Sequence, residues 1–300
     1  MISSIEANRS CVVDVASVTR KFGDKIALDN LSLSIPRGIV FGLIGGNGAG
    51  KTTLIKHILG MYRAHAGTVH VFGRDPVADP VGVLGRIGYL SEDRDLPNWM
   101  RVGELMGYTE AFFPSWDRRF AEELCQQFEL DKRTRVRHLS RGQRARAGLL
   151  VALAHRPDLL VLDEPSSGLD PVVRRDILGA IIRTIADEGR TVLFSSHLLD
   201  EVERVADQIA IIHHGRILLA GFMDEIKQQH SRVTVRMSGN SNTPPTFAGM
   251  LACEGSGPDW TCVCSGQEDQ WRPTVEGVGA EIIEHSAMTL DEIFVARVRG

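Results

Sequence analysis

The stretch Gly45-Gly-Asn-Gly-Ala-Gly-Lys-Thr-Thr53 decides the fold of this 300-residue chain. It has the pattern G-x-x-x-x-G-K-T, follows the apolar run Ile39–Ile44 and precedes Leu54–Leu59, whose apolar residues have helical spacing. A strand, a glycine-rich turn and a helix in this order are typical of a phosphate-binding loop, because glycines let backbone N–H groups turn toward an anion. The pattern therefore predicts a site for a nucleoside triphosphate, formed by Gly45, Gly46, Asn47, Gly48, Ala49, Gly50, Lys51, Thr52 and Thr53.

Two side chains of this loop have separate expected roles. Lys51 is a point charge suited to the β- and γ-phosphates, and the hydroxyl of Thr52 is suited to Mg²⁺. The competing interpretation is a chance glycine-rich turn, which the strand and helix on either side disfavour. The loop predicts that a nucleoside triphosphate is bound, and it leaves open how the energy of that nucleotide is used.

Composition excludes several classes of protein. A net charge of −4 argues against a protein whose main role is to coat nucleic acid. No apolar run reaches the ~18 residues of a membrane span, and Met1–Arg9 lacks the pattern of a signal peptide. The five cysteines are too few and too scattered for a disulfide framework. These features lead us to expect a cytoplasmic protein.

The order of the sequence patterns predicts an α/β fold in two parts. Cys11–Val18 and Ala27–Ile35 are strand-like and favour a short antiparallel sheet, whereas Val102–Leu130 has helical spacing. The composition changes beyond about Gln228. We expect a domain at 1–227, with a helical insert at about 93–155, and a small α/β accessory domain at 228–300.

A pair of carboxylates follows the fully apolar run Leu159–Leu162. Such a run predicts a buried parallel strand, so Asp163 would lie beside the phosphate-binding loop and could hold Mg²⁺. Glu164 would face the γ-phosphate and could act as the base for an attacking water. A solvated turn is the usual interpretation of an Asp-Glu pair, but the apolar run and the upstream loop disfavour it here.

Taken in order, the motifs resemble those of the ATP-binding cassette family over residues 11–227. They are the phosphate-binding loop, Ser91-Glu92, Leu139–Gln143, Asp163-Glu164, Ser167–Asp170 and His197. The resemblance implies a P-loop NTPase core with a RecA-like mixed sheet, an antiparallel β subdomain and Mg²⁺-dependent ATP hydrolysis. It implies that His197 contacts the γ-phosphate and that Phe22 stacks on adenine. Without the resemblance, His197 would be a structural histidine and Phe22 a core residue.

The resemblance also implies that the site is shared between two copies of the chain. Ser140, Gly142 and Gln143 would close over ATP bound to the second copy in a head-to-tail dimer, and Asp170 would lie at the same seam. In isolation, Leu139–Gln143 could equally be only a capped helix start. Glu92 stands where the family commonly has glutamine; it keeps an oxygen for Mg²⁺ but loses the amide donor.

The resemblance leads us to expect the energy-supplying subunit of a transporter, with separate transmembrane permease subunits and a position on the cytoplasmic face of the membrane. Met288–Phe294 resembles the ending of cassettes paired with export-type, ABC-2-like permeases, which favours export. The alternative is a soluble mechanical ATPase acting on ribosomes or DNA. The single cassette and the acidic composition disfavour that class, and we expect no nucleic-acid partner.

Overall fold

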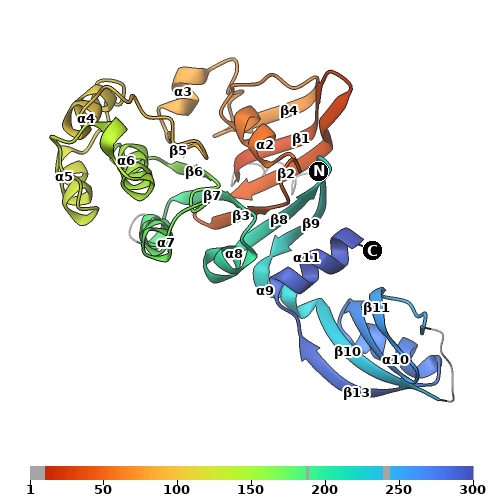
Figure 1. Cartoon of the computed structure of the whole chain (residues 1–300). Helices are drawn as coiled ribbons and strands as arrows, with labels where there is room; N and C mark the ends of the chain where they lie inside the picture. The colour runs from red at the N-terminus through yellow and green to blue at the C-terminus, as the bar shows by residue number, and fades with distance from the viewer. Residues whose placement is uncertain (1–10, 187–188, 239–243, 300) are drawn as a thin grey trace. The chain divides into compact units, whose positions relative to one another are not determined.

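The computed structural model describes residues 11–186, 189–238 and 244–299, so the expectation for Met1–Arg9 falls outside the described residues. The chain divides into two compact units, the first ending at Leu219 and the second beginning at Ala220 (Figure 1). The sequence-based division between residues 227 and 228 falls nearby, within the short helix α9 (Met223–Gln228).

The centre of the first unit is a sheet with strand order β5-β6-β7-β3-β8-β9. Each neighbouring pair in the series β5-β6-β7-β3-β8 is parallel. Strands β3 and β6 are buried along their whole length because both faces of the sheet are covered. A two-residue turn joins β8 to β9, which makes that pair antiparallel. The mixed sheet predicted from the sequence is therefore confirmed. Its strands are β3 (Val40–Ile44), β5 (Ile87–Leu90), β6 (Leu159–Asp163), β7 (Thr191–Ser196), β8 (Gln208–His213) and β9 (Arg216–Phe222).

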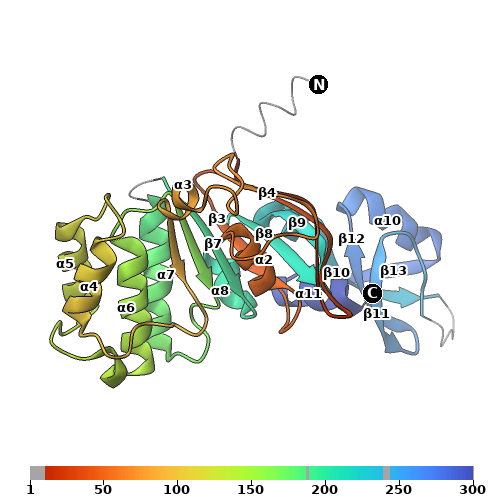
Figure 2. The ribbon, with the colours of Figure 1, turned by 90° about the horizontal axis from the view of Figure 1, so that it is seen from above.

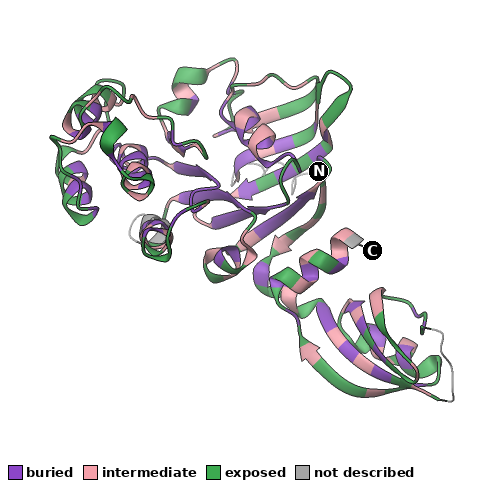
Figure 3. Cartoon of the chain, viewed as in Figure 1, coloured by how far each residue is buried: buried purple, intermediate pink, exposed green. Residues whose placement is uncertain are grey.

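Helices cover both faces of this sheet (Figure 1). Helix α2 (Lys51–Ile58) packs on one face, and α7 (Pro171–Ala186) and α8 (Leu199–Val205) pack on the other. Figure 3 shows the resulting buried band along β3, β6 and β7. Since parallel strands end at the same edge, the residues that follow β3, β6 and β7 meet at one edge of the sheet.

An antiparallel sheet with strand order β2-β1-β4 packs on the other side of α2 and shares its core. This is the predicted antiparallel subdomain, with β1 (Cys11–Phe22), β2 (Lys25–Pro36) and β4 (Ala66–Val71). The short helix α3 (Pro80–Leu84) leads into β5.

Between β5 and β6 the chain is helical, within the range expected for the insert. Helix α6 packs on β5, and α4 and α5 gather around it at one end of the first unit (Figure 2). The insert contains α4 (Val102–Glu110), α5 (Arg118–Gln127), the 3₁₀ turn η1 (Val136–His138) and α6 (Arg141–Leu153).

The second unit is a small α/β structure with its own core. Its antiparallel sheet has strand order β11-β12-β10-β13, and Trp271 and Val275 of α10 pack against it. The elements are β10 (His230–Met237), β11 (Met250–Ser256), β12 (Asp259–Ser265), α10 (Glu268–Gly277), β13 (Ala280–Ala287) and α11 (Leu290–Arg299). None of the helices formed by the described residues has the length and hydropathy that a membrane span requires.

Candidate nucleotide site

The phosphate-binding loop connects β3 to α2 in a conformation that requires glycine. Gly48 and Gly50 have positive φ angles of 76° and 118°. A Cβ on Gly45 would lie 2.5 Å from the carbonyl oxygen of Ile212, and one on Gly50 would lie 2.7 Å from that of Ala27. Gly50 is also the N-cap of α2 and provides no side-chain cap, so the first N–H groups of the helix remain available to an anion.

The loop lines a cavity of about 310 Å³. Phe22 lines this cavity and is 43% exposed, so it is not a core residue. Its ring meets Tyr62 edge-on at a centroid distance of 5.6 Å, and the Arg20 guanidinium lies 4.7 Å from its centroid. The lining residues are Phe22, Lys25, Ala27, Gly46, Asn47, Gly48, Gly50, Lys51, Thr52, Thr53, Glu92 and Glu164. The cavity thus joins an aromatic ring, a phosphate-binding loop and two carboxylates.

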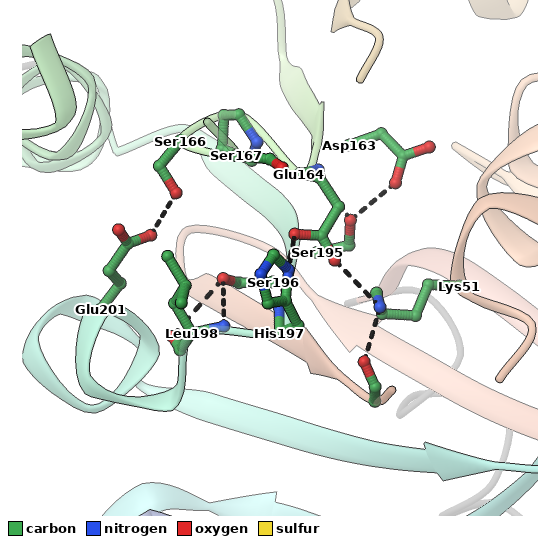
Figure 4. Close-up of polar contacts among 12 residues, drawn as sticks. Lys51, Asp163, Glu164, Ser166, Ser167, Ser195, Ser196, His197, Leu198 and Glu201 are labelled. Carbon is green, nitrogen blue, oxygen red and sulfur yellow. Dashed lines mark hydrogen bonds and ion pairs between the residues drawn. The ribbon is translucent and has the colours of Figure 1, made fainter. Parts of the chain in front are cut away.

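Lys51 and Glu164 form a buried ion pair in this cavity, each with a side chain only 6% exposed. The ammonium Nζ lies 2.9 Å from Oε1 of Glu164 and donates to the carbonyl oxygen of Gly45 at 2.6 Å (Figure 4). Lys51 therefore connects the loop to the end of β6. A bound phosphate would compete with the carboxylate of Glu164 for the Lys51 ammonium.

Glu164 is also bound to His197. Oε2 of Glu164 lies 2.7 Å from Nδ1 of His197, whose ring is 40% exposed (Figure 4). The backbone of Glu164 has a φ of 47°, and its N–H donates to Oγ of Ser195 at 3.0 Å. A non-glycine residue in this left-handed region persists only where the surroundings hold it, and here the neighbouring strand β7 does so.

Asp163 ends β6 with one oxygen satisfied and one free. Oδ1 accepts a hydrogen bond from Oγ of Ser195 at 2.7 Å, whereas Oδ2 is buried and has no hydrogen-bond partner among the described residues. Burial raises the pKa of Asp163, and the Ser195 hydroxyl opposes that rise. Thr52, Glu92 and Asp163 line a second cavity of about 370 Å³. A hydroxyl and two carboxylates are the hard oxygen donors that Mg²⁺ prefers, so these residues fit the ion.

Four further candidate residues line neither of the two cavities. Ser140, Gly142, Gln143 and Asp170 are absent from the described residues that line them. Ser140 and Gln143 form a capping box at the start of α6, with Oγ accepting from Gln143 N–H at 3.2 Å and Oε1 accepting from Ser140 N–H at 3.0 Å. Ser140 and Gln143 are nonetheless exposed, and so is Asp170.

Gly142 and Asp170 also have local structural roles. A Cβ on Gly142 would lie 2.7 Å from a methyl group of Val173, so glycine permits α6 and α7 to approach. Asp170 caps α7 by accepting from the N–H groups of Val172 and Val173, and these bonds lower the pKa of its carboxyl. The alternative interpretation of Leu139–Gln143 as a capped helix start is therefore met at α6. Within a single chain this helix start does not line the nucleotide cavity.

Sequence reasoning missed Ser195, whose hydroxyl donates to the carboxylate of Asp163 and accepts from the backbone N–H of Glu164. A signal was present: Ser195 follows the apolar residues of β7 and pairs in register with Asp163 of β6. Polar residues at the carboxyl ends of neighbouring parallel strands meet, but strand adjacency has to be known first.

Comparison with known proteins gives consistent similarities. Residues 28–167 match the profile of a family described as ABC transporter. The chain is 36% identical to the daunorubicin/doxorubicin resistance ATP-binding protein DrrA of Streptomyces peucetius, over 75% of this chain and 69% of that protein. It is 33% identical to the Nod factor export ATP-binding protein I of Rhizobium sp. strain N33, over 73% of each. A solved structure of an ATP-binding subunit of an ABC transporter superposes with a TM-score of 0.67 and 27% identity, over 73% of this chain and 92% of that one.

Proposed function

The chain belongs to the ABC transporter family as an ATP-binding subunit, and from that premise we propose that two copies hydrolyse ATP head to tail and so power export through separate transmembrane subunits. One observation carries the shared site: Ser140, Gln143 and Asp170 are exposed but do not line the cavity that contains Lys51 and Glu164. A second copy would bring those segments to the γ-phosphate side of the loop.

In the proposed reaction, Glu164 accepts the proton of the attacking water. Its two partners, Lys51 and His197, are themselves the side chains assigned to the phosphates. When ATP takes both partners, the carboxylate is released and can orient water in line with the γ-phosphate. Mg²⁺ held by Thr52 and Asp163, with Glu92 nearby, would neutralise charge on the phosphate oxygens. Phe22 would stack on adenine and so orient ATP with its γ-phosphate at Lys51.

Export as the direction of transport is supported by the relatives. One is named for daunorubicin and doxorubicin resistance, another for Nod factor export and a third for bacitracin transport. These names favour export of a substrate by a membrane partner on whose cytoplasmic side this subunit would dock. They do not favour the alternative of a soluble ATPase acting on ribosomes or DNA.

The shared site is tested by mixing two inactive variants. A Lys51→Ala dimer has two defective loops, and a Ser140→Arg dimer has two defective capping segments. In a mixed head-to-tail dimer, one site combines both defects, and the other joins an intact loop to an intact Ser140. We expect each variant alone to be inactive and the mixture to regain ATP hydrolysis, measured as phosphate release. A mixture that stays inactive while each variant is folded would contradict the shared site.

A further inference from the structure

Arg94 is a buried cation that the proposed reaction does not use. Its side chain lies near the nucleotide cavities, the residue is only 7% exposed, and Nη2 donates to the carbonyl oxygens of Pro165 at 3.2 Å and Ser167 at 2.8 Å. Its Nε–H has no hydrogen-bond partner among the described residues. Burial lowers the pKa of Arg94, and the charge of Arg141 lowers it further. A guanidinium held by neutral carbonyls is an unfavourable arrangement for stability alone.

The backbone of Arg94 belongs to the same turn as Glu92. Arg94 N–H donates to the carbonyl oxygen of Ser91 at 3.1 Å, which closes a turn around Glu92, and the φ of Arg94 is 51°. Glu92 lines the nucleotide cavity from this same turn. A tight turn with a left-handed non-glycine residue has few alternative conformations, so a displacement of Glu92 would also displace the Arg94 guanidinium.

The segment that Arg94 holds joins Glu164 to Asp170. Within it, Ser167 N–H donates to the carbonyl oxygen of Glu164 at 3.2 Å, so the segment turns back on the catalytic residue. On another side, Oγ of Ser166 donates to Oε2 of Glu201 at 2.5 Å (Figure 4). Glu201 is 2% exposed and lies on α8, which follows His197. The segment Pro165–Ser167 is therefore hydrogen-bonded on one side to Arg94, in the turn that contains Glu92, and on the other to Glu201 of α8.

We propose that Arg94 is a positioning residue, which transmits the position of the Glu92 turn to the Pro165–Ser167 segment and thereby to Glu164 and Asp170. This inference rests on the proposed function, since it assigns Glu164 to water activation and Asp170 to the dimer seam. Nucleotide contact at Glu92 would set the carbonyls of Pro165 and Ser167 through two hydrogen bonds from one rigid guanidinium. Hydrolysis would then depend on an engaged Glu92 turn.

The first test compares Arg94→Met and Arg94→Lys with the control Arg190→Met. Arg190 also donates to a proline carbonyl, that of Pro157 at 2.9 Å, at the opposite end of β6. Arg94 lines the second cavity but not the first, and its guanidinium is bonded to the carbonyl oxygens of Pro165 and Ser167. We therefore expect Arg94→Met to bind ATP with near wild-type affinity and KM. Its kcat should fall ~10-fold to 100-fold, as small misplacements of a catalytic group do. Arg94→Lys should regain part of the kcat, and Arg190→Met should keep all of it.

The second test measures coupling between Glu92 and Arg94. If Arg94 transmits the state of the Glu92 turn, Glu92→Ala combined with Arg94→Met should hydrolyse ATP no more slowly than the slower single variant. Losses that multiply would overturn the inference, and so would an unchanged kcat in Arg94→Met or an equal loss in Arg190→Met. A wild-type chain without ATPase activity would instead refute the proposed function.

Discussion

At the scale of single residues, the centre of the site is a carboxylate bound to the two side chains that we assign to the phosphates of ATP. Glu164 is buried between Lys51 and His197, and the sequence placed all three in the site from their motifs. Asp163 and Glu164 were predictable because a run of four apolar residues ends in them. Ser195 and Arg94 were not, because their roles arise from contacts with segments more than thirty residues away.

Replacing Glu164 by Gln keeps the shape of the side chain and removes the proton acceptor. We expect Glu164→Gln to bind ATP, to lose ~100-fold or more in kcat, as loss of a general base does, and to accumulate the ATP-bound dimer. Phosphate release, ATP affinity and size-exclusion chromatography with ATP report these three properties. Glu225→Gln, an exposed exchange on α9, serves as the matched control. Unchanged steady-state hydrolysis in Glu164→Gln would remove Glu164 from the base role.

At the scale of elements, the strands that carry the site were the most predictable part of the fold. Strands β3, β6 and β7 are buried along their whole length, and β6 and β7 each contain an apolar run, Leu159–Leu162 and Val192–Phe194, that burial on both faces requires. Strand β11, helix α10 and strand β13 were not predicted. Helix α10 contains Pro273 within a polar sequence, and most residues of β13 are exposed or half-buried, so hydrophobic periodicity identifies neither.

Two helices begin with the same capping arrangement, which allows a matched comparison. Ser140 pairs with Gln143 at the start of α6, and Thr289 pairs with Glu292 at the start of α11. Replacing either cap by Ala should cost about 1 kcal/mol of stability. We expect only Ser140→Ala to lower ATP hydrolysis, because its hydroxyl is also assigned to ATP on the second copy.

Thermal unfolding and phosphate release of Ser140→Ala and Thr289→Ala separate the two effects. Equal losses of activity in both would mean that helix stability accounts for the result. Full activity in Ser140→Ala would mean that the hydroxyl serves α6 alone, and the assignment of this segment to nucleotide would then be wrong.

At the scale of the whole molecule, all residues assigned to ATP lie in the first unit. The buried clusters of the two units share no member among the described residues: the first includes Leu43 and Leu193, and the second includes Val233 and Trp271. A domain whose core is complete does not need a second one for folding. The accessory unit is therefore expected to contribute to regulation or partner choice rather than to hydrolysis.

A chain that ends at Phe222 tests this division, because it keeps β9 whole and removes the second unit beyond that strand. We expect it to retain the kcat and thermal stability of the nucleotide-binding unit, measured as ATP-dependent phosphate release and as the unfolding transition in ATP. A chain that ends at Arg216 is the matched counterpart: it removes most of β9, including Ile217, which packs on the first core. That chain should lose stability, since β8 would become an unpaired edge. Loss of hydrolysis in the folded chain ending at Phe222 would instead make the second unit part of the ATPase mechanism.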